Sequence, residues 1–114
     1  MRGRPVKSII RQNIVEILFF MKSGHGYEIY KVYRQLFPGI TMRSVYYHLK
    51  KGLFTGEFKV ERVSRVKGNY SWGGEAQLIY YSLSDKAEPK ILKRVEHFFS
   101  KYEMPEAKRA LHKI

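Results

Sequence analysis

Residues 41–56, TMRSVYYHLKKGLFTG, decide the fold because they predict a helix with one apolar side and one basic side. Apolar residues recur there every four positions, a spacing that places side chains on one face of an α-helix. Gly52 and Gly56 are two candidate ends for this helix. The end at Gly56 is favoured, since Leu53 and Phe54 extend the apolar stripe. The stripe starts at Val45 and Leu49 and continues to Leu53.

Two further helices are predicted ahead of this one. Ser8 can cap a helix that runs to about Ser23, with Gly24 as its left-handed stop. A second helix spans Tyr27 to Leu36, and Thr41 is a good N-cap for the third. Each helix has an apolar face, so the three can share one core. The stripe of the first helix is Ile10, Ile14, Ile17, Leu18 and Met21.

After Gly56 the apolar period changes from that of a helix to that of a strand. Residues 57–66 predict one strand, with a β-bulge near Glu61-Arg62, and residues 77–83 predict its returning partner. Ser84-Asp85 can then cap a long C-terminal helix with Pro89 in its first turn. The apolar stripe of that helix is Ile91, Val95, Phe98, Phe99 and Tyr102.

This order of elements predicts an α+β, mostly helical fold of the winged helix-turn-helix type, with three helices, a two-stranded hairpin and a C-terminal helix. Residues 67–74, rich in turn formers, would form the hairpin loop. We expect a basic N-terminal arm over residues 1–8, the winged helix-turn-helix domain over residues 9–84, and a C-terminal helical segment over residues 85–114.

The charge of the chain points to a polyanionic ligand. Its 114 residues include 22 Lys+Arg and 10 Asp+Glu, a formal net charge of +12. Such an excess attracts polyanions and speeds their diffusional encounter. Nucleic acid is favoured over an anionic membrane, because the helices need their apolar faces for a core. A soluble protein with an ordinary basic surface is the alternative.

The residue types present argue against catalysis. Without cysteine the chain has no disulfide framework and no thiolate metal site. The four histidines have no metal-ligand spacing, and no nucleophile pairs with a base. No apolar run is long enough for a membrane span, and the first residues do not form a secretory signal. We therefore expect a cytoplasmic, non-enzymatic protein without metal or cofactor.

Candidate nucleic-acid-binding residues fall in three places. With Val45 and Leu49 facing inward, a turn of about 100° per residue puts bases and a tyrosine on the opposite side of the third helix. The hairpin tip offers aromatic rings, although Trp72 can equally fold back onto the hairpin or a partner. Residues 2–5 have the shape of a minor-groove hook, with a disordered basic arm as the simpler interpretation. The three sets are Thr41, Arg43, Ser44, Tyr47, Lys50 and Lys51; Lys67, Asn69, Tyr70 and Trp72; and Arg2, Arg4, Lys7 and Arg11.

Three motifs resemble the PadR-type winged-helix transcriptional regulators. Residues 25–29, HGYEI, match the opening of the second helix in that family. Residues 44–46 with Leu49 and Gly56 resemble its recognition helix, and residues 80–84, YYSLS, resemble its final strand. The resemblance covers roughly residues 9–88.

The resemblance implies a homodimer that pairs through the C-terminal helix, and often through the first helix. The dimerising residues would be those of the apolar stripe from Ile91 to Tyr102. The third helix would enter the major groove of DNA, and the hairpin would contact the flanking backbone. Many members of the family sense a small molecule, and nothing in this chain identifies one.

The leading hypothesis is a dimeric, DNA-binding transcriptional regulator of this type. An RNA- or ribosome-associated factor with the same fold is the main alternative, and as a dimer it could bridge two particles. The high charge, the lack of an added effector domain and the aromatic hairpin tip favour that alternative. A protein–protein adaptor is a third class, and the charge of +12 disfavours it.

Overall fold

The computed structural model describes residues 8–70 and 73–102, with only the backbone described at residues 66–70 and 73–76. This part of the chain has an α+β fold with four helices and a three-stranded antiparallel sheet. Three helices, a hairpin and a further helix follow one another as the sequence predicts. The helices are α1 (Ile9–Met21), α2 (Gly26–Leu36), α3 (Met42–Thr55) and α4 (Lys93–Lys101), and the strands are β1 (Ser23–His25), β2 (Phe58–Tyr70) and β3 (Gly73–Leu83).

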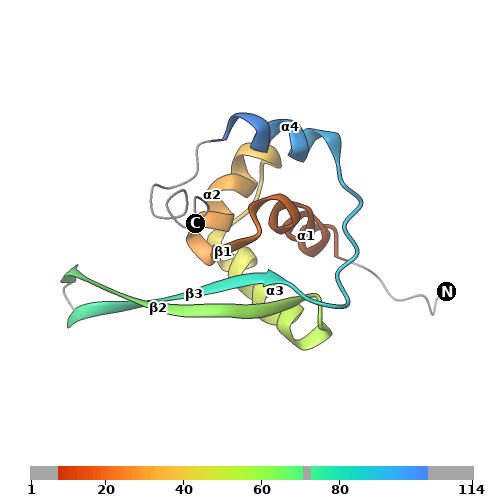
Figure 1. The fold of residues 1–114 in the computed structure, drawn as a ribbon. Coiled ribbons are helices and arrows are strands. Elements are labelled where there is room, and N and C mark those ends of the chain that lie inside the picture. Colours follow the sequence, from red (N-terminus) through yellow and green to blue (C-terminus); the bar gives the residue numbers. More distant parts are fainter. Residues whose placement is uncertain (1–7, 71–72, 103–114) are drawn as a thin grey trace, which may run out of the picture.

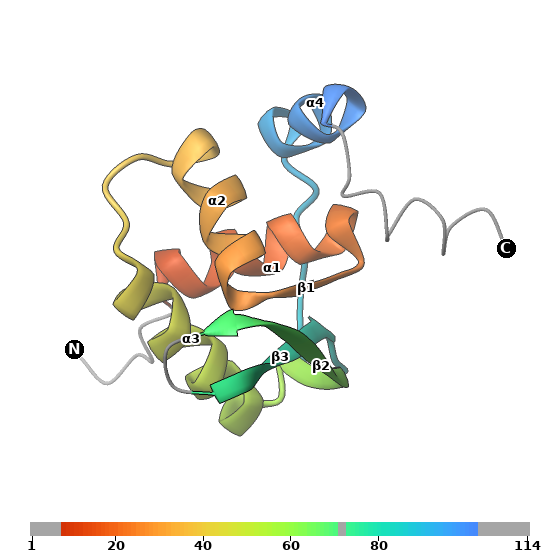
Figure 2. The same ribbon diagram turned by 90° about the vertical axis from the view of Figure 1, so that its left-hand side faces the viewer.

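The core lies between the first three helices and one face of the sheet. The apolar stripes predicted for these helices supply most of its buried side chains, and Phe58 and Tyr81 add those of the sheet. The hairpin of β2 and β3 projects beyond the helices, and α4 lies at the opposite end of the molecule (Figure 1). Figure 2 shows the same separation from the side, with α3 beside the hairpin. The helical members of the core include Ile14, Ile17, Leu18, Ile29, Val32, Val45 and Leu49.

Side-chain caps fix where each of the first three helices begins. Ser8 Oγ accepts a hydrogen bond from the backbone N–H of Arg11 at 3.2 Å, and Thr41 Oγ1 accepts one from Ser44 at 3.1 Å. At α2, His25 and Glu28 form a reciprocal capping box. The predicted caps at Ser8 and Thr41 are therefore confirmed.

The region around Gly24 differs from the prediction. Lys22, with φ of 76°, ends α1 in place of Gly24. Gly24 lies instead in β1, opposite Tyr81 of β3, where a Cβ would overlap the sulfur of Met21. This third strand was missed because three residues are too few to show an alternating pattern.

Helix α3 ends where the sequence predicts, but its buried apolar stripe is shorter than predicted. Gly56, with φ of 88°, closes the helix in the left-handed conformation. Phe54 is 89% exposed and Leu53 is also exposed, so the prediction that they extend the buried stripe is wrong. The buried position of this turn belongs to Gly52, because the ring of Phe58 fills the space where a side chain would lie.

The sheet has the strand order β1-β3-β2. The register between β2 and β3 shifts between Val60 and Arg62, which confirms the predicted bulge. The strands are longer than expected, since Lys67 pairs with Glu75 and Tyr70 pairs with Gly73 in the stretch that the sequence assigned to a loop. The hairpin therefore forms a long arm rather than a short turn.

The connection to α4 is extended, and the predicted helix start after Ser84-Asp85 is wrong. Residues 87–92 have no helical structure, and α4 begins at Lys93. The cause is Glu16 of α1, which is fully buried. Its carboxylate accepts hydrogen bonds from the backbone N–H groups of Lys90 at 2.8 Å and Ile91 at 2.9 Å. Ile91 consequently lies outside the helix, with φ of 60°, and not on its apolar stripe.

Candidate nucleic-acid interface

The outer side of α3 carries the residues that the sequence singled out. Arg43, Tyr47 and Lys50 are exposed, and Tyr47 is 57% accessible. They lie opposite Val45 and Leu49, which are fully buried. The predicted orientation of these side chains is confirmed, and their contact with nucleic acid stays a prediction. Thr41 and Lys51 are also exposed, and Ser44 is half-buried.

The charge of this face is uniformly basic along the helix. Residues 42–55 contain three Lys or Arg and no Asp or Glu. Exposed bases on a helix face can reach phosphate oxygens or the edges of guanine, and a tyrosine hydroxyl can reach a phosphate. We call this set of Arg43, Tyr47 and Lys50 the α3 face.

Phe54 extends the α3 face toward the end of the helix. At about 100° per residue, Phe54 follows Lys50 by one turn, on the same side as Arg43 and Tyr47. The ring is almost fully exposed, although an isolated aromatic side chain gains by burial. The prediction that Phe54 extends the buried stripe is wrong because Gly52 already occupies the inner position of that turn.

Arg11 was predicted to bind nucleic acid with the N-terminal arm, but the structure places it in α1 with its guanidinium already engaged. Its Nε donates to Glu57 Oε1 at 2.7 Å, and its Nη1 lies 3.3 Å from His48 Nδ1. Thr55 Oγ1 donates to the same carboxylate oxygen at 2.7 Å. Arg11 therefore ties α1 to the end of α3, and its charge is largely neutralised by Glu57.

His48 belongs to this same group of contacts. Partial burial lowers the pKa of His48, and the charge of Arg11 lowers it further against an opposing effect of Glu57. The neutral imidazole can accept a hydrogen bond from Arg11. His48 is thus a packing residue at the margin of the α3 face.

The β2 strand adds exposed bases that lie outside the three predicted sets of site residues. Lys59, Arg62 and Arg65 are all exposed. The guanidinium of Arg62 lies 3.8 Å from the centre of the Tyr80 ring, a cation–π contact that holds it on the sheet. The alternation of charged and apolar residues over 58–66 could have indicated these bases, but it was interpreted only as evidence for a strand.

The remaining predicted site residues lie near the hairpin tip or outside the described part of the chain. Lys67, Asn69 and Tyr70 lie in β2 close to the hairpin tip, where the backbone is described. Arg2, Arg4, Lys7 and Trp72 lie outside the described residues. Their expected contacts with nucleic acid stay predictions.

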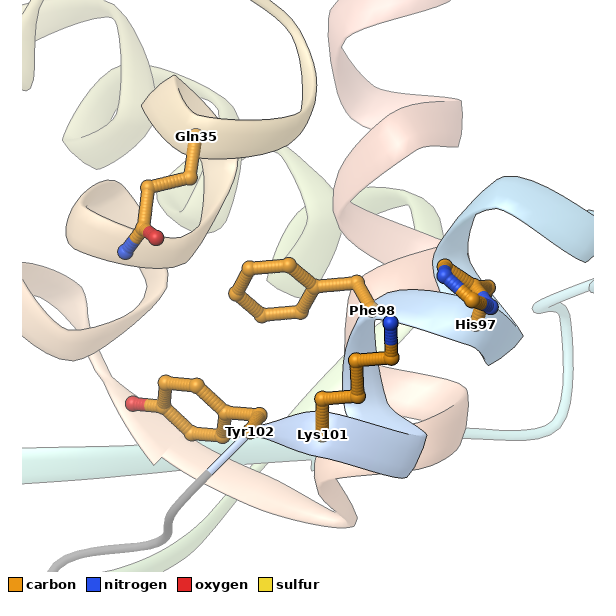
Figure 3. Close-up of a pocket in the computed structure, with 5 residues that line it drawn as sticks. All are labelled: Gln35, His97, Phe98, Lys101 and Tyr102. Atoms are coloured by element: carbon orange, nitrogen blue, oxygen red, sulfur yellow. The ribbon is translucent and has the colours of Figure 1, made fainter.

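The proposed dimerisation stripe divides between the core and the surface. Val95 is fully buried in the core of its own chain, and Phe99 stacks on Phe20 of α1 with ring centres 6.0 Å apart. Phe98 and Tyr102 stack on each other at 5.2 Å and face a hollow of about 470 Å³. Figure 3 shows the ring of Phe98 on α4 and that of Tyr102, just after α4, directed toward α2, which contributes Gln35. Burial, and to a lesser degree Glu28, raise the pKa of Tyr102.

No family model matches the sequence, and no curated protein resembles it significantly. The function is therefore inferred from the geometry of the chain itself. In residues 8–70 and 73–102, no three His, Asp or Glu side chains gather as a metal site requires. Among the helices of this part of the chain, none combines the length and apolarity that crossing a bilayer demands.

Proposed function

We propose that the protein is a non-enzymatic nucleic-acid-binding protein with a winged helix-turn-helix fold. In this proposal α2 and α3 form the helix-turn-helix, α3 is the recognition helix, and the β2–β3 hairpin is the wing. The order of the elements and the packing of α3 against the first strand of the hairpin support this assignment. The reciprocal cap of His25 and Glu28 agrees with the family motif at residues 25–29.

The observation that carries the proposal is the exposed α3 face on a strongly basic chain. Arg43 and Lys50 lie on that face with Tyr47 between them, and the helix has no acidic residue that would repel phosphate. Lys and Arg side chains that neutralise phosphates release the counterions of the nucleic acid. This release favours binding and makes the affinity fall as the salt concentration rises. The projecting hairpin adds Lys59, Arg62 and Arg65 to the positive surface.

Duplex DNA is the first candidate ligand, and transcriptional regulation of the PadR type is the first candidate role. A major groove about 12 Å wide admits one helix, so α3 can lie in it with the α3 face toward the bases. The hairpin would then contact the flanking backbone. A dimer would place two copies of α3 on half-sites about one helical turn apart.

The dimer would form through α4. The hollow beside Phe98 and Tyr102 is open on the surface. Gln35 lies across the hollow and is exposed, so Gln35→Arg places a charge there without disturbing the core. We expect this variant to shift the protein from dimer to monomer in light scattering at rising dilution. An unchanged mass would contradict dimerisation at this hollow.

Structured RNA of a ribosomal particle is the second candidate ligand. The observation that favours it is the exposure of two aromatic rings, Tyr47 and Phe54, along one side of α3. Aromatic rings bind unstacked bases, which single-stranded loops and bulges of RNA present and a duplex does not. A dimer with this specificity could bridge two particles.

Recovery and sequencing of the nucleic acid that copurifies with the native protein separates these roles. A DNA regulator should retain fragments that share a palindrome and should protect that site in a footprint. An RNA-associated factor should sediment with ribosomes, and ribonuclease or high salt should release it. If the protein retains no polyanion at about 150 mM salt, the proposal is wrong and an adaptor role gains support.

A further inference from the structure

A small pocket lies where the start of α2 meets the middle of α3 and the strand β3. Its volume is about 190 Å³. Three tyrosines from three different elements line it, and its polar lining includes a lysine and a glutamine. These residues are Tyr27 of α2, Tyr46 and Lys50 of α3, and Gln77, Ile79 and Tyr81 of β3.

The rings of the pocket are held in place by packing. A Cβ at Gly26 would overlap the ring of Tyr46, so the glycine lets this ring lie directly on the start of α2. Tyr81 is buried, and its burial, together with the neighbouring Tyr46, raises the pKa of its hydroxyl. Tyr27 and Tyr46 each keep nearly half of their surface exposed. Lys31 Nζ lies 5.5 Å from the centre of the Tyr27 ring, and the exposed remainder of both rings gives the pocket preformed aromatic surface.

The rim of the pocket is positive. None of the side chains that line it is acidic, and Lys50 belongs both to the pocket and to the α3 face. Gln77 pairs across the hairpin with Arg65, and cross-strand partners project from the same face of a sheet. Arg65 is exposed, so two cations flank the aromatic pocket.

We propose that this pocket binds one unpaired nucleobase of the bound nucleic acid, stacked on its tyrosines. Lys50 and Arg65 would hold the phosphates on either side of that nucleotide, and the Gln77 amide offers a donor and an acceptor to the base edge. The inference rests on the proposed function and narrows it, because it selects a nucleic acid with a bulged, flipped or single-stranded base. Stacking on the tyrosines adds to the binding free energy of such a ligand, and a fully paired duplex does not gain this contribution.

Two short RNA duplexes of the same sequence test the proposal, one fully paired and one with a single bulged 2-aminopurine. The fluorescence of 2-aminopurine falls when the base stacks on an aromatic ring. We expect the protein to bind the bulged duplex about tenfold more tightly than the paired one and to quench its fluorescence. The same pair made of DNA shows whether the preference needs the 2′-hydroxyl.

Variants separate the pocket from the rest of the interface. Tyr27→Leu should abolish the preference and the quenching, while Tyr27→Phe, which keeps the ring, should retain both. Tyr47 lies on the α3 face and does not line the pocket, so Tyr47→Leu should weaken binding of both duplexes alike.

Equal affinity for the two duplexes without quenching overturns the pocket and leaves the proposed function standing. Failure to bind any of the four duplexes, RNA or DNA, at low salt overturns both. Adenosine monophosphate tests whether the pocket instead binds a free nucleotide, which carries the same base and phosphate groups. If it binds in a manner that depends on Tyr27 while the protein prefers neither duplex, the pocket belongs to a free nucleotide and the proposal is wrong.

Discussion

Gly52 of α3 lies directly against the ring of Phe58, the first residue of β2, at a position where any Cβ would overlap that ring. This contact joins the helix that carries the α3 face to the strand that carries the exposed bases of the hairpin. Because Gly52 has no side chain, α3 can approach the sheet closely enough for both elements to meet one ligand. This close approach therefore helps to set the orientation of α3 relative to the hairpin.

Gly52→Ala should destabilise the protein although alanine is the better helix former. Overpacking a core costs about 1–3 kcal/mol, which exceeds the gain in helix propensity of about 1 kcal/mol. We expect a net loss of stability and a fall in Tm of about 4–8 °C for each kcal/mol lost. Adding Phe58→Leu should recover part of the loss, as chemical unfolding of the double variant will show. A single variant that is more stable than the native protein would contradict the contact.

Glu16 is predicted to hold the segment that leads to α4. Glu16→Ala leaves two backbone N–H groups, those of Lys90 and Ile91, without their acceptor. These part-buried hydrogen bonds go to a charged acceptor and are each worth about 1.5–3 kcal/mol, so we expect a loss of at least about 2 kcal/mol in urea unfolding. Glu96→Ala removes an exposed carboxylate of α4 and serves as the control. Equal stability of the two variants would refute the role of Glu16.

The pH dependence of stability should carry a contribution from His48. Its pKa is lowered in the folded protein from the ordinary value of 6.5, chiefly by burial and then by Arg11. The unfolded chain therefore binds the proton more readily, so stability is lost as the pH falls below 6.5 toward the folded pKa. Proton NMR of the imidazole should show titration below the ordinary value, and Arg11→Met should raise that pKa. His48→Gln should reduce the acid-side loss of stability, and a loss identical to that of the native protein would exclude His48 as its source.

The parts of the fold that follow from local pattern could be predicted from the sequence. The apolar faces of the first two helices, the pair Val45 and Leu49 of the third, the cap at Thr41, the end at Gly56 and the bulge after Val60 each follow from local sequence pattern. The exposed side of α3 followed in the same way, because once Val45 and Leu49 face inward the opposite side is fixed.

Features that depend on distant contacts could not be predicted. The start of α4 depends on Glu16, whose hydrogen-bond partners are 74 and 75 residues away in the chain. The close approach of α3 to the sheet depends on Phe58 filling the space beside Gly52. The pocket requires Tyr27, Tyr46 and Tyr81 to meet, and no spacing in the sequence indicates that they do.

The salt dependence of nucleic-acid binding tests the central claim most directly. The double variant Arg43→Ala/Lys50→Ala should bind the copurified nucleic acid more weakly and flatten the plot of log affinity against log salt by about one to two units. Lys90→Ala/Lys93→Ala, which removes two exposed bases near α4, should leave the slope close to the native one. A slope that is unchanged in the first variant would show that the α3 face does not contact the ligand.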